Sequence, residues 1–499
     1  MLPTMEAGTL LNDHDQAVKQ IQEQVRRFAA RKQRVRIYHG STNSTRLTTF
    51  ETGKFVDVSS LNHVVEINTE QRFALVEPNV PMDALVEVTL KVGLIPPVVP
   101  EFPGITIGGA VQGGAEESSS FRYGMVHDTC FEYELVLGNG ERIDASPTQH
   151  ADLFAGTAAS YGSLGILTRI KLKLIPAKPF VRVCYERVHN AAEALELLRS
   201  HSKLLAVEYL DAILFSPTHG VIISGSLSDE VDLPVARFSR AIDEWHYLHA
   251  QTISQHHQSY QELVPIRDYL FRYDRGAFWM AKHGLGILPI PFNRLTRFVF
   301  NGITKTRPSY RFLHETALAQ RFIIQDFNLP IETAHQFMAE LDETVHIYPL
   351  WLCPLRPGNP AGWSANDLET ELVINIGVWG PAPIDFDSFV AVNRDLERRM
   401  AALGGRKMLY AQAYYTEAEF WELYDRKHYQ QLRRRYHAEQ LFPTIYEKTH
   451  VTQQYTPSIW RGLWRLIKSP VSIPTQQPSA LVEAADTTYD SPIKRSKAR

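Results

Sequence analysis

The sequence predicts an α+β protein with two domains and a polar C-terminal segment. Over residues 20–180, short apolar runs recur between turn residues, and patterns of helical spacing lie among them. Pro176 and Pro179 interrupt this pattern, and a new strand-like run starts at Phe180. Residues 471–499 are rich in Ser, Pro, Thr, Gln and charge, which is too polar to bury a core. We therefore expect domains at 1–180 and 181–455, and an amphipathic segment with a disordered tail at 456–499.

The elements of the first domain follow from its hydrophobic spacing. Val18, Ile21, Val25 and Phe28 are close to helical spacing, which predicts a leading amphipathic helix over 15–32. A second helix is predicted over 82–92, directly after Pro81. Apolar runs bounded by turn residues predict strands at 35–38, 64–67, 73–76, 133–137 and 165–175.

The second domain shows a different sequence of patterns. Helices are predicted at 190–206, 329–343, 386–403 and 416–436. Strands are predicted at 207–226, 346–353, 371–379 and 408–415. Together they indicate an antiparallel sheet with helices on one face.

Composition narrows the possible partners and the compartment. The net charge of −3 over 499 residues gives no general attraction to nucleic acid. The three cysteines, Cys130, Cys184 and Cys353, are far apart in the sequence and fit neither a disulfide framework nor a metal site. There is no signal-peptide pattern and no apolar run long enough to span a bilayer. We expect a protein of the cytoplasm, or one peripheral on the cytoplasmic face of a membrane.

Three glycine-bearing segments carry the strongest functional signal. The first, VRIYHGSTNSTR, contains a loop whose backbone N–H groups and hydroxyls suit a pyrophosphate, although such a loop also occurs as a polar hairpin turn. The second, PEFPGITIGGAVQGGAEESSSFRYG, has clustered glycines that let a cofactor lie against the backbone; the alternative is a structural turn. The third, LFAGTAASYGSLGILTRIKLKLIP, leads into an alternating strand and by itself indicates only a strand start. The three together favour a bound cofactor.

The order and the residue sequences of these segments resemble the flavin domain of the vanillyl-alcohol-oxidase type, also called the PCMH-type FAD-binding fold. The resemblance implies that the GSTNST loop binds the pyrophosphate of FAD, that the PGITIGG stretch lines the isoalloxazine, and that the GSLGILT turn meets the adenine side. The FAD-binding residues that it implies are Gly40, Ser41, Thr42, Asn43, Ser44, Thr45, Pro103, Gly104, Thr106, Ile107, Gly108, Gly109, Gly113, Gly114, Glu117, Ser118, Ser119, Gly162, Gly165 and Ile166.

Further segments narrow the resemblance to one family. Four segments are similar to segments of the sterol Δ24-reductase family, over about residues 35–448: the glycine-rich stretch of residues 100–140, HIYPLWLCP, ELVINIGVWG and MLYAQAYYTEAEFWELYD. Membership would imply an FAD-dependent oxidoreductase acting on CH–CH groups. It would reduce a C=C bond of a lipid, either a sterol side chain or a methylene-branched fatty-acyl chain, with NADPH or NADH as electron donor.

Three other functions stay open. The same flavin could serve a fatty-acyl desaturase. It could also serve an oxidase or dehydrogenase of a sugar lactone or hydroxy acid, although HIYPLWLCP and ELVINIGVWG are mainly apolar and aromatic. The third alternative is a noncatalytic lipid-binding protein, against which the intact glycine segments argue.

The attachment of FAD is predicted from one residue. Some members of the wider flavoprotein family attach FAD covalently through a histidine in the pyrophosphate loop, and this chain has Asn43 at that position. Because asparagine cannot form that bond, we expect noncovalent FAD. His39, just outside the loop, is the alternative attachment residue, although a histidine at a strand end is more often structural.

The catalytic acid and the lipid contact are predicted from the matching segments. A hydride carrier needs a proton donor or acceptor nearby, and the candidates are Glu117, Tyr123, His127, Tyr348, Glu371 and Tyr414. Arg272 and Arg275 are expected either to meet a phosphate of lipid or NADPH, or to form surface ion pairs. Residues 458–470 combine tryptophans with basic residues at helical spacing, which suits a membrane surface; the alternative is a helix packed on the second domain.

Overall fold

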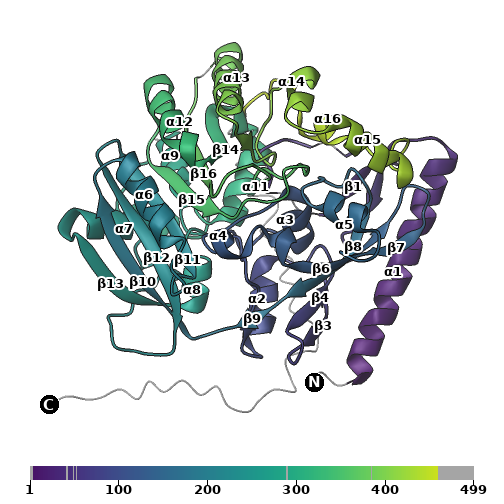
Figure 1. Cartoon of the computed structure of the whole chain (residues 1–499), viewed down its shortest axis with the longest axis horizontal. Helices are drawn as coiled ribbons and strands as arrows, with labels where there is room; N and C mark the ends of the chain where they lie inside the picture. Colours follow the sequence, from purple (N-terminus) through teal and green to yellow (C-terminus); the bar gives the residue numbers. More distant parts are fainter. Residues whose placement is uncertain are drawn as a thin grey trace.

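The computed structural model describes residues 4–40, 43–48, 50–51, 53–287, 290–383 and 385–458. Figure 1 shows the N-terminal elements beside a larger sheet, with the C-terminal helices running along the top from the sheet back to the N-terminal part. The fold is a mixed α+β architecture of antiparallel sheets with packed helices, as the sequence predicts.

The first part of the chain is built on a five-stranded antiparallel sheet. Its strand order is β3 (Val64–Asn68), β4 (Phe73–Val76), β8 (Ile166–Lys173), β6 (Cys130–Val136) and β7 (Arg142–Ala145). Two small pairs adjoin it, β1 (Arg36–Tyr38) with β2 (Phe55–Asp57), and β5 (Leu94–Ile95) with β9 (Ile175–Pro176). The helices of this part are α2 (Met82–Leu90), α3 (Ile107–Gly113), α4 (Ser120–Tyr123) and α5 (Ala151–Thr157), with the 3₁₀ turn η1 (Val126–Thr129).

The leading helix α1 (Thr4–Ala30) packs along the edge of this part. Val18, Ile21 and Val25, the residues that predict the helix, are buried, because their spacing places them on one face. They share a core cluster with Ala438, Leu441 and Phe442 from the far end of the chain.

The second part is built on an eight-stranded sheet. Its order is β13 (Ser259–Pro265), β10 (Phe180–Val188), β12 (His219–Ser228), β11 (Tyr209–Ser216), β15 (Leu350–Leu355), β16 (Val373–Pro381), β14 (Phe322–Pro330) and β17 (Arg406–Lys407). All its pairings are antiparallel. The helices of this part are α6 (Ala191–His201), α7 (His246–His256), α8 (Ile266–Leu270), α9 (Met280–Ile287), α10 (Arg294–Val299), α11 (Thr306–Thr316), α12 (Ile331–Thr344) and α13 (Phe386–Ala402), with the 3₁₀ turn η2 (Leu318–Arg321).

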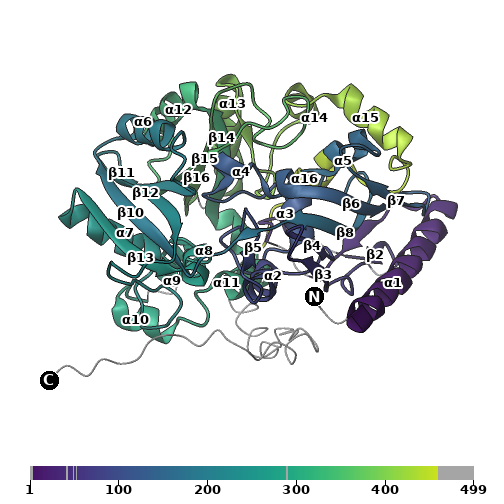
Figure 2. The same cartoon turned by 60° about the horizontal axis from the view of Figure 1, so that its bottom comes forward.

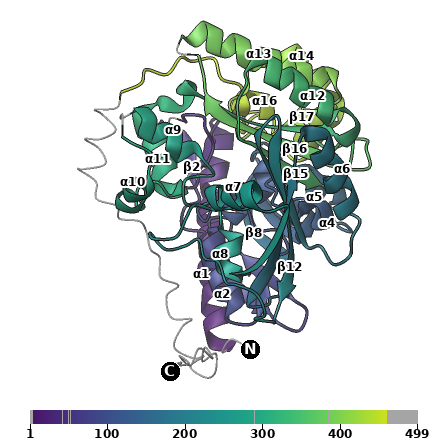
Figure 3. The same cartoon turned by 90° about the vertical axis from the view of Figure 1, so that its left-hand side faces the viewer.

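The expectation that helices cover one face of this sheet is wrong. On β12, Ile222 belongs to the core cluster of α6, whereas Val221 and Ile223 belong to the cluster of α7. Because successive side chains of a strand point to opposite faces, the two helices lie on opposite sides. Figure 3 shows α6 and α7 on either side of the strands. The periodicity of the helices does not encode this, since α7 lies in a region to which the sequence assigned no element.

Two further expectations are corrected by the structure. Residues 416–436 form two helices, α14 (Glu417–Glu422) and α15 (Arg426–Arg435), because the Asp425 side chain accepts a hydrogen bond from the His428 N–H and starts a new helix. Residues 408–415 are irregular apart from one bridge between Ala413 and His450, because this segment crosses between the two parts of the chain instead of extending the sheet.

The end of the described chain returns to the first part. The last helix, α16 (Ile445–Thr449), follows α15, and the Arg433 side chain donates hydrogen bonds to backbone carbonyls that include that of Ser163. Within the described ranges, no helix has the length and apolar character needed to cross a bilayer. Residues 459–499, which hold the predicted tail and nearly all of the predicted membrane segment, lie outside the described residues.

Candidate functional site

One cavity of about 2540 Å³ lies between the two parts of the chain. From the first part it is lined by β1, the loops after β1 and before α3, and α3 itself. From the second part it is lined by α9, α11 and side chains of β14, β15 and β16. In Figure 2, α3 of the first part and α11 of the second part both lie near the middle of the molecule.

The cavity brings many of the predicted FAD-binding residues together. The predicted residues that line it are Gly40, Asn43, Ser44, Pro103, Gly104, Thr106, Gly108, Gly109, Gly113, Gly114 and Gly162. Ser41 and Thr42 lie outside the described residues. The other predicted positions are not among its lining: Thr45, Ile107, Glu117, Ser118, Ser119, Gly165 and Ile166.

Two glycines of α3 differ in what their small size permits. A Cβ on Gly108 would lie 2.5 Å from Cβ of Pro78, so glycine is needed there for helix packing. A Cβ on Gly113 would meet nothing within 4 Å and would project into open space beside the cavity. Gly113 therefore leaves room for a group to lie against the backbone.

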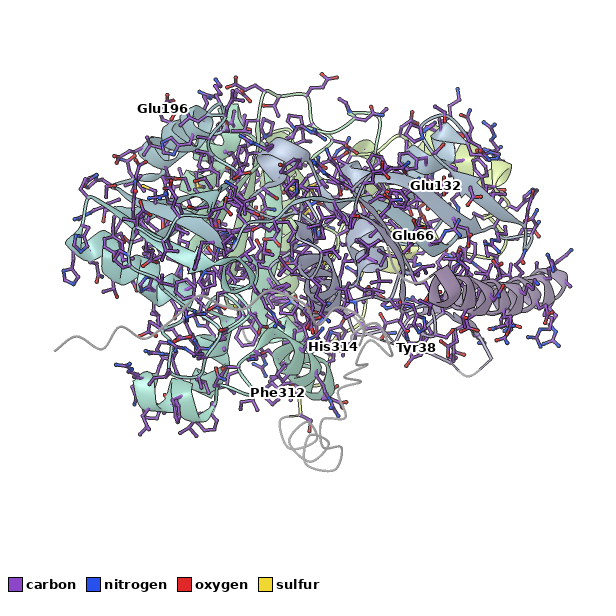
Figure 4. The ribbon with its side chains drawn as sticks, turned by 90° about the horizontal axis from the view of Figure 1, so that it is seen from below. Tyr38, Glu66, Glu132, Glu196, Phe312 and His314 are labelled. Carbon is purple, nitrogen blue, oxygen red and sulfur yellow. The ribbon has the colours of Figure 1, made fainter. Side chains whose placement is uncertain are left out.

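The loop predicted to hold pyrophosphate is fixed by a distant segment. The Ser44 hydroxyl donates to the Tyr410 carbonyl at 2.8 Å, and the Thr45 N–H donates to the same oxygen at 3.2 Å. Arg46 donates to the carbonyls of Leu409 and Ala411. From the other side, His314 on α11 is 2.7 Å from the Ser44 carbonyl. Figure 4 labels His314 and Tyr38, which line the cavity from α11 and β1.

Positive charge gathers at the end of the cavity near this loop. Arg36, Arg46 and Lys448 all line it, and none of them forms an ion pair within the described part of the chain. Burial, together with the neighbouring positive charges of Arg36, Arg433 and Arg46, lowers the pKa of Lys448 to about 7. Gln112 Nε2 is buried there without a hydrogen-bond acceptor among the described residues. A cluster of donors that lacks an anion fits a pyrophosphate.

The other wall of the cavity is aromatic. Phe278 and Trp379 have ring centroids 4.4 Å apart, and the Trp351 and Trp379 rings are 6.0 Å apart. Phe102 from the first part meets Phe278 at 5.7 Å and Tyr310 of α11 at 6.0 Å. All five residues line the cavity, so this wall suits an apolar ligand.

Three buried carboxyl groups face the cavity between these two regions. They are Glu101 and Glu116 from the first part and Asp326 from β14, and each has one oxygen without a partner among the described residues. The Tyr410 hydroxyl donates to the other Asp326 oxygen at 2.5 Å. Burial raises the pKa of Asp326 to about 7, although the bond from Tyr410 opposes this. Burial also raises the pKa of Glu116, and the Asp326 and Glu101 carboxyls raise it further. These groups can hold protons near neutral pH.

The six catalytic candidates named from the sequence lie elsewhere, since none is among the residues lining the cavity. Glu117 is fully buried and pairs with Arg272 at 3.1 Å. His127 is buried in η1, where burial lowers its pKa. Tyr414 is buried and its hydroxyl donates to the Gln412 side chain. These contacts are structural, and a catalytic role for the three stays a prediction.

The other three candidates lie nearer the surface. Glu371 is exposed and forms an ion pair with Arg199 at 2.7 Å. Tyr123 is half-buried on α4, with the Lys173 ammonium 6.0 Å from its ring, and half-buried Tyr348 precedes β15. Their roles also stay predictions.

Both predicted phosphate-binding arginines are engaged by other groups of the protein. Arg272 is fully buried, and it pairs with Glu117 from the first part and with Asp211 at 3.1 Å. Arg275 is buried and donates to Asn301 and to several backbone carbonyls. The surface ion pairs offered by the sequence are therefore wrong, because both side chains are buried, whereas contact with a ligand phosphate stays a prediction, since Arg275 lines the cavity.

Sequence reasoning missed several residues that line the cavity, although some left a signal. Arg36 and Arg46 flank the first glycine segment, and Glu116 adjoins the chosen Glu117. Asp326 stands out as a charge inside the apolar run FIIQDFNLP. Lys448 gave no local signal, because only the folding of α16 against β1 brings it to the site.

Known proteins match this chain in two ways, over its N-terminal part and over most of its length. The family model described as FAD binding domain matches residues 16–146. The chain is 28% identical to the Delta(24)-sterol reductase of Homo sapiens over 446 residues, which cover 87% of this chain and 86% of that protein. It is 28% identical to the Delta(24)-sterol reductase homolog dhcr-24 of Caenorhabditis elegans over 468 residues, 88% of this chain and 87% of that protein. For the Delta(24)-sterol reductase of Arabidopsis thaliana the identity is 26% over 431 residues, 79% of this chain and 76% of that protein. The predicted FAD domain and the predicted family resemblance are both confirmed.

Proposed function

We propose that this FAD-dependent oxidoreductase, which is similar to the Delta(24)-sterol reductases over most of its length, reduces a C=C bond of a lipid with NADPH or NADH. The observation that carries the proposal is the layout of the cavity. An aromatic wall from the second part lies opposite the glycine segments of the first part, and a protonatable carboxyl lies between them. A lipid alkene needs an apolar wall, and its reduction needs a proton source.

The residues present fit FAD. Arg36, Arg46 and Lys448 would hold the pyrophosphate, and the backbone around Gly113 would lie against the ring system. Asn43 leaves the binding noncovalent. When bound, FAD would supply the two-electron hydride chemistry.

Asp326 is the residue that we assign to the proton. Reduction of C=C adds one hydride to one carbon and one proton to the other, so the chain must provide an acid. Asp326 on β14 presents one oxygen without a partner, and Tyr410 holds the other oxygen. The Asp326 carboxyl gives its proton to the substrate carbon and regains one from solvent through the open cavity.

The aromatic wall also bears on the alternatives. Trp351, Trp379 and Phe278 offer little to the hydroxyls of a sugar lactone or a hydroxy acid, so these substrates are second candidates. A sterol side chain and a methylene-branched acyl chain are both apolar and suit the wall equally. For a desaturase, the same carboxyl would accept a proton instead of donating one.

The test uses the purified full chain loaded with FAD. We expect the flavin absorbance to bleach when NADPH or NADH is added without oxygen. It should then return on addition of a sterol with an unsaturated side chain or of a methylene-branched acyl lipid, with product about two mass units heavier. Bleaching by an aldonolactone or a 2-hydroxy acid, with none by NADPH or NADH, would replace this proposal with the oxidase alternative. A colourless protein that rejects FAD would favour the noncatalytic one.

A further inference from the structure

Residues 275–314 form a basic stretch of the chain. They contain seven Arg and Lys residues and no Asp or Glu. Arg275 is buried, and Arg297 and Arg307 form ion pairs with Glu244 and Asp83. The remaining four form no ion pair within the described ranges: Lys282, Arg294, Lys305 and Arg311. This stretch therefore carries a net positive charge toward solvent.

The same stretch exposes large apolar side chains. On α10, which has no buried residue, Leu295, Phe298 and Val299 are 70%, 52% and 63% exposed. Ile303 in the following turn is 57% exposed. Exposed apolar residues gathered on one protruding helix are unusual for a protein surface that faces only water. Figures 2 and 3 show α10 projecting from the molecule next to α9 and α11.

This surface continues into the cavity. Ile303 is exposed and also lines the cavity, and Ile287 at the end of α9 does the same. Gly302 and Lys305 line it between α10 and α11. Apolar side chains beside α10 therefore lie both at the surface and in the cavity lining.

We propose that α10 and its flanking basic residues dock the protein on an anionic lipid bilayer, so that the cavity opens toward the membrane. Leu295, Phe298 and Val299 enter the interface between headgroups and acyl chains, while Lys282 and Arg294 meet lipid phosphates. The delivery of substrate through this opening rests on the proposed function; the docking itself does not.

Charge decides between a bilayer and other occupants of this face. A second copy of the chain would bring two basic stretches together, which repels. Residues 459–499 carry seven basic and three acidic residues, a net charge of +4, so this segment is repelled as well. An anionic headgroup layer has the opposite sign and takes up exposed apolar side chains at the same time.

The test is co-sedimentation of the full-length protein with vesicles of phosphatidylcholine, with and without phosphatidylglycerol. We expect stronger binding to the vesicles that contain phosphatidylglycerol. The triple variant Leu295→Ser, Phe298→Ser and Val299→Ser should lower the vesicle affinity about ten-fold or more. The double variant Lys282→Gln and Arg294→Gln should remove most of the preference for anionic lipid. The matched control, Leu205→Ser with Val231→Ser, changes side chains that are 91% and 66% exposed elsewhere and should bind like the unaltered protein.

Two results would overturn the proposal. The first is a triple variant that binds vesicles as tightly as the unaltered protein. The second is a dimer of the unaltered protein that the triple variant dissociates in size-exclusion chromatography, since the face would then hold a second copy. Vesicle binding is read without turnover, so its loss is distinct from a failure of the proposed function. With substrate dispersed in detergent, the triple variant should keep the unaltered rate, whereas with substrate in vesicles its rate should fall.

Discussion

Asp326 shows how burial gives a side chain a chemical property that it lacks in water. The Tyr410 hydroxyl holds one Asp326 oxygen at 2.5 Å, and the other oxygen has no partner within the described residues. Burial raises the pKa of Asp326 to about 7, which keeps a share of the carboxyl protonated at neutral pH. An acid with this pKa can give a proton to carbon and recover it from water.

The first prediction concerns this pair. Asp326→Asn should slow reoxidation of the reduced flavin by a lipid alkene about 100-fold or more, because general acid catalysis contributes on that order. Reduction of the flavin by NADPH should stay unchanged. For the unaltered protein, the rate of the alkene step should fall as the pH rises through about 7, because Asp326 loses its proton there. Stopped-flow absorbance separates the two steps.

Tyr410→Phe tests the same pair from its other side. It should shift the pH dependence of the alkene step to higher pH, because the hydrogen bond that favours the Asp326 carboxylate is lost. Tyr415→Phe is the matched control, since Tyr415 is buried, does not line the cavity and has a hydroxyl without a partner in the described structure. An unchanged pH profile in Tyr410→Phe would speak against the assignment of the acid.

The second prediction concerns the basic end of the cavity. Lys448→Met should weaken FAD binding about ten-fold or more, since a hydrogen bond to a charged group is worth about 1.5 to 3 kcal/mol. FAD affinity of the unaltered protein should fall above about pH 7, because Lys448 must take up a proton to meet the phosphates. Fluorescence titration of the apoprotein with FAD measures both effects. Lys203→Met, at an exposed site outside the cavity, should leave the affinity unchanged.

The third prediction concerns the attachment of FAD. Acid precipitation should release all yellow colour into the supernatant, because Asn43 cannot bond to the flavin. His39 lines the cavity with its buried Nδ1 lacking a partner among the described residues, so it is the residue to examine if colour stays with the protein. In that case His39→Ala should set the colour free.

At the scale of the element, one buried histidine links helix α1 to the sheet of the first part. His14 Nδ1 lies 2.7 Å from Glu77, and Nε2 lies 2.9 Å from Glu134. Burial alone would lower the pKa of His14, but the hydrogen bonds and charges of both carboxylates outweigh it and raise the pKa to about 9. Both ring nitrogens therefore carry protons, and α1 is fixed by an imidazolium between two carboxylates.

The fourth prediction follows from the sign of this shift. Because the folded pKa lies above the unfolded value of 6.5, the His14 contribution is complete below about pH 6.5 and is lost as the pH rises through about 9. Its size is on the order of 3 kcal/mol at low pH, from about 1.4 kcal/mol per pKa unit. His14→Gln should therefore lower the denaturant midpoint more at pH 6 than at pH 9.5. His335→Gln, at an exposed site on α12, is the control and should lower it equally little at both.

At the scale of the whole molecule, residues near the C-terminal end of the described chain complete the hydrophobic core of the first part. Ala438, Leu441 and Phe442 share one core cluster with Val18 and Ile21. Arg433 and Arg435 add a hydrogen bond to the Ser163 carbonyl and an ion pair with Asp152. The boundary expected near residue 180 stays a prediction, and a first domain cut at the start of β10 would lack part of its own core.

The fifth prediction tests whether these C-terminal residues stabilise the first part of the chain. Phe442→Ala should destabilise the protein by about 3 to 5 kcal/mol, because it removes a fully buried ring. FAD should also be lost earlier during unfolding, since the cluster adjoins the β1 region of the cavity. Phe131→Ala removes a ring that is 44% exposed and should cost much less. Denaturant unfolding followed by tryptophan and flavin fluorescence compares the two variants. Equal losses of stability would contradict the role of the C-terminal residues in the core of the first part.

Much of the fold could be predicted because its signals are local. The helix α1, the strands β3, β4, β6 and β8 of the first sheet and the helices α6, α12 and α13 follow from spacing and turn residues. The stretch between residues 229 and 328 was left without elements, although it contains β13, most of β14 and α7 to α11. In this stretch α10 buries no side chain and α11 buries only Thr306 and Thr316, so no apolar periodicity marks them.

The sequence by itself determined the cofactor class and the kind of reaction, because glycine-rich loops and long matching segments are properties of neighbouring residues. Only the tertiary structure decided which groups face the cavity. It brought Arg36 and Lys448 into the lining of the same cavity and placed the Asp326 carboxyl beside the Tyr410 hydroxyl. It also placed Glu117 in a buried ion pair. It also left α10 exposed. The physical reason is that desolvation and charge interactions depend on distances in space, whereas sequence patterns report only neighbours along the chain.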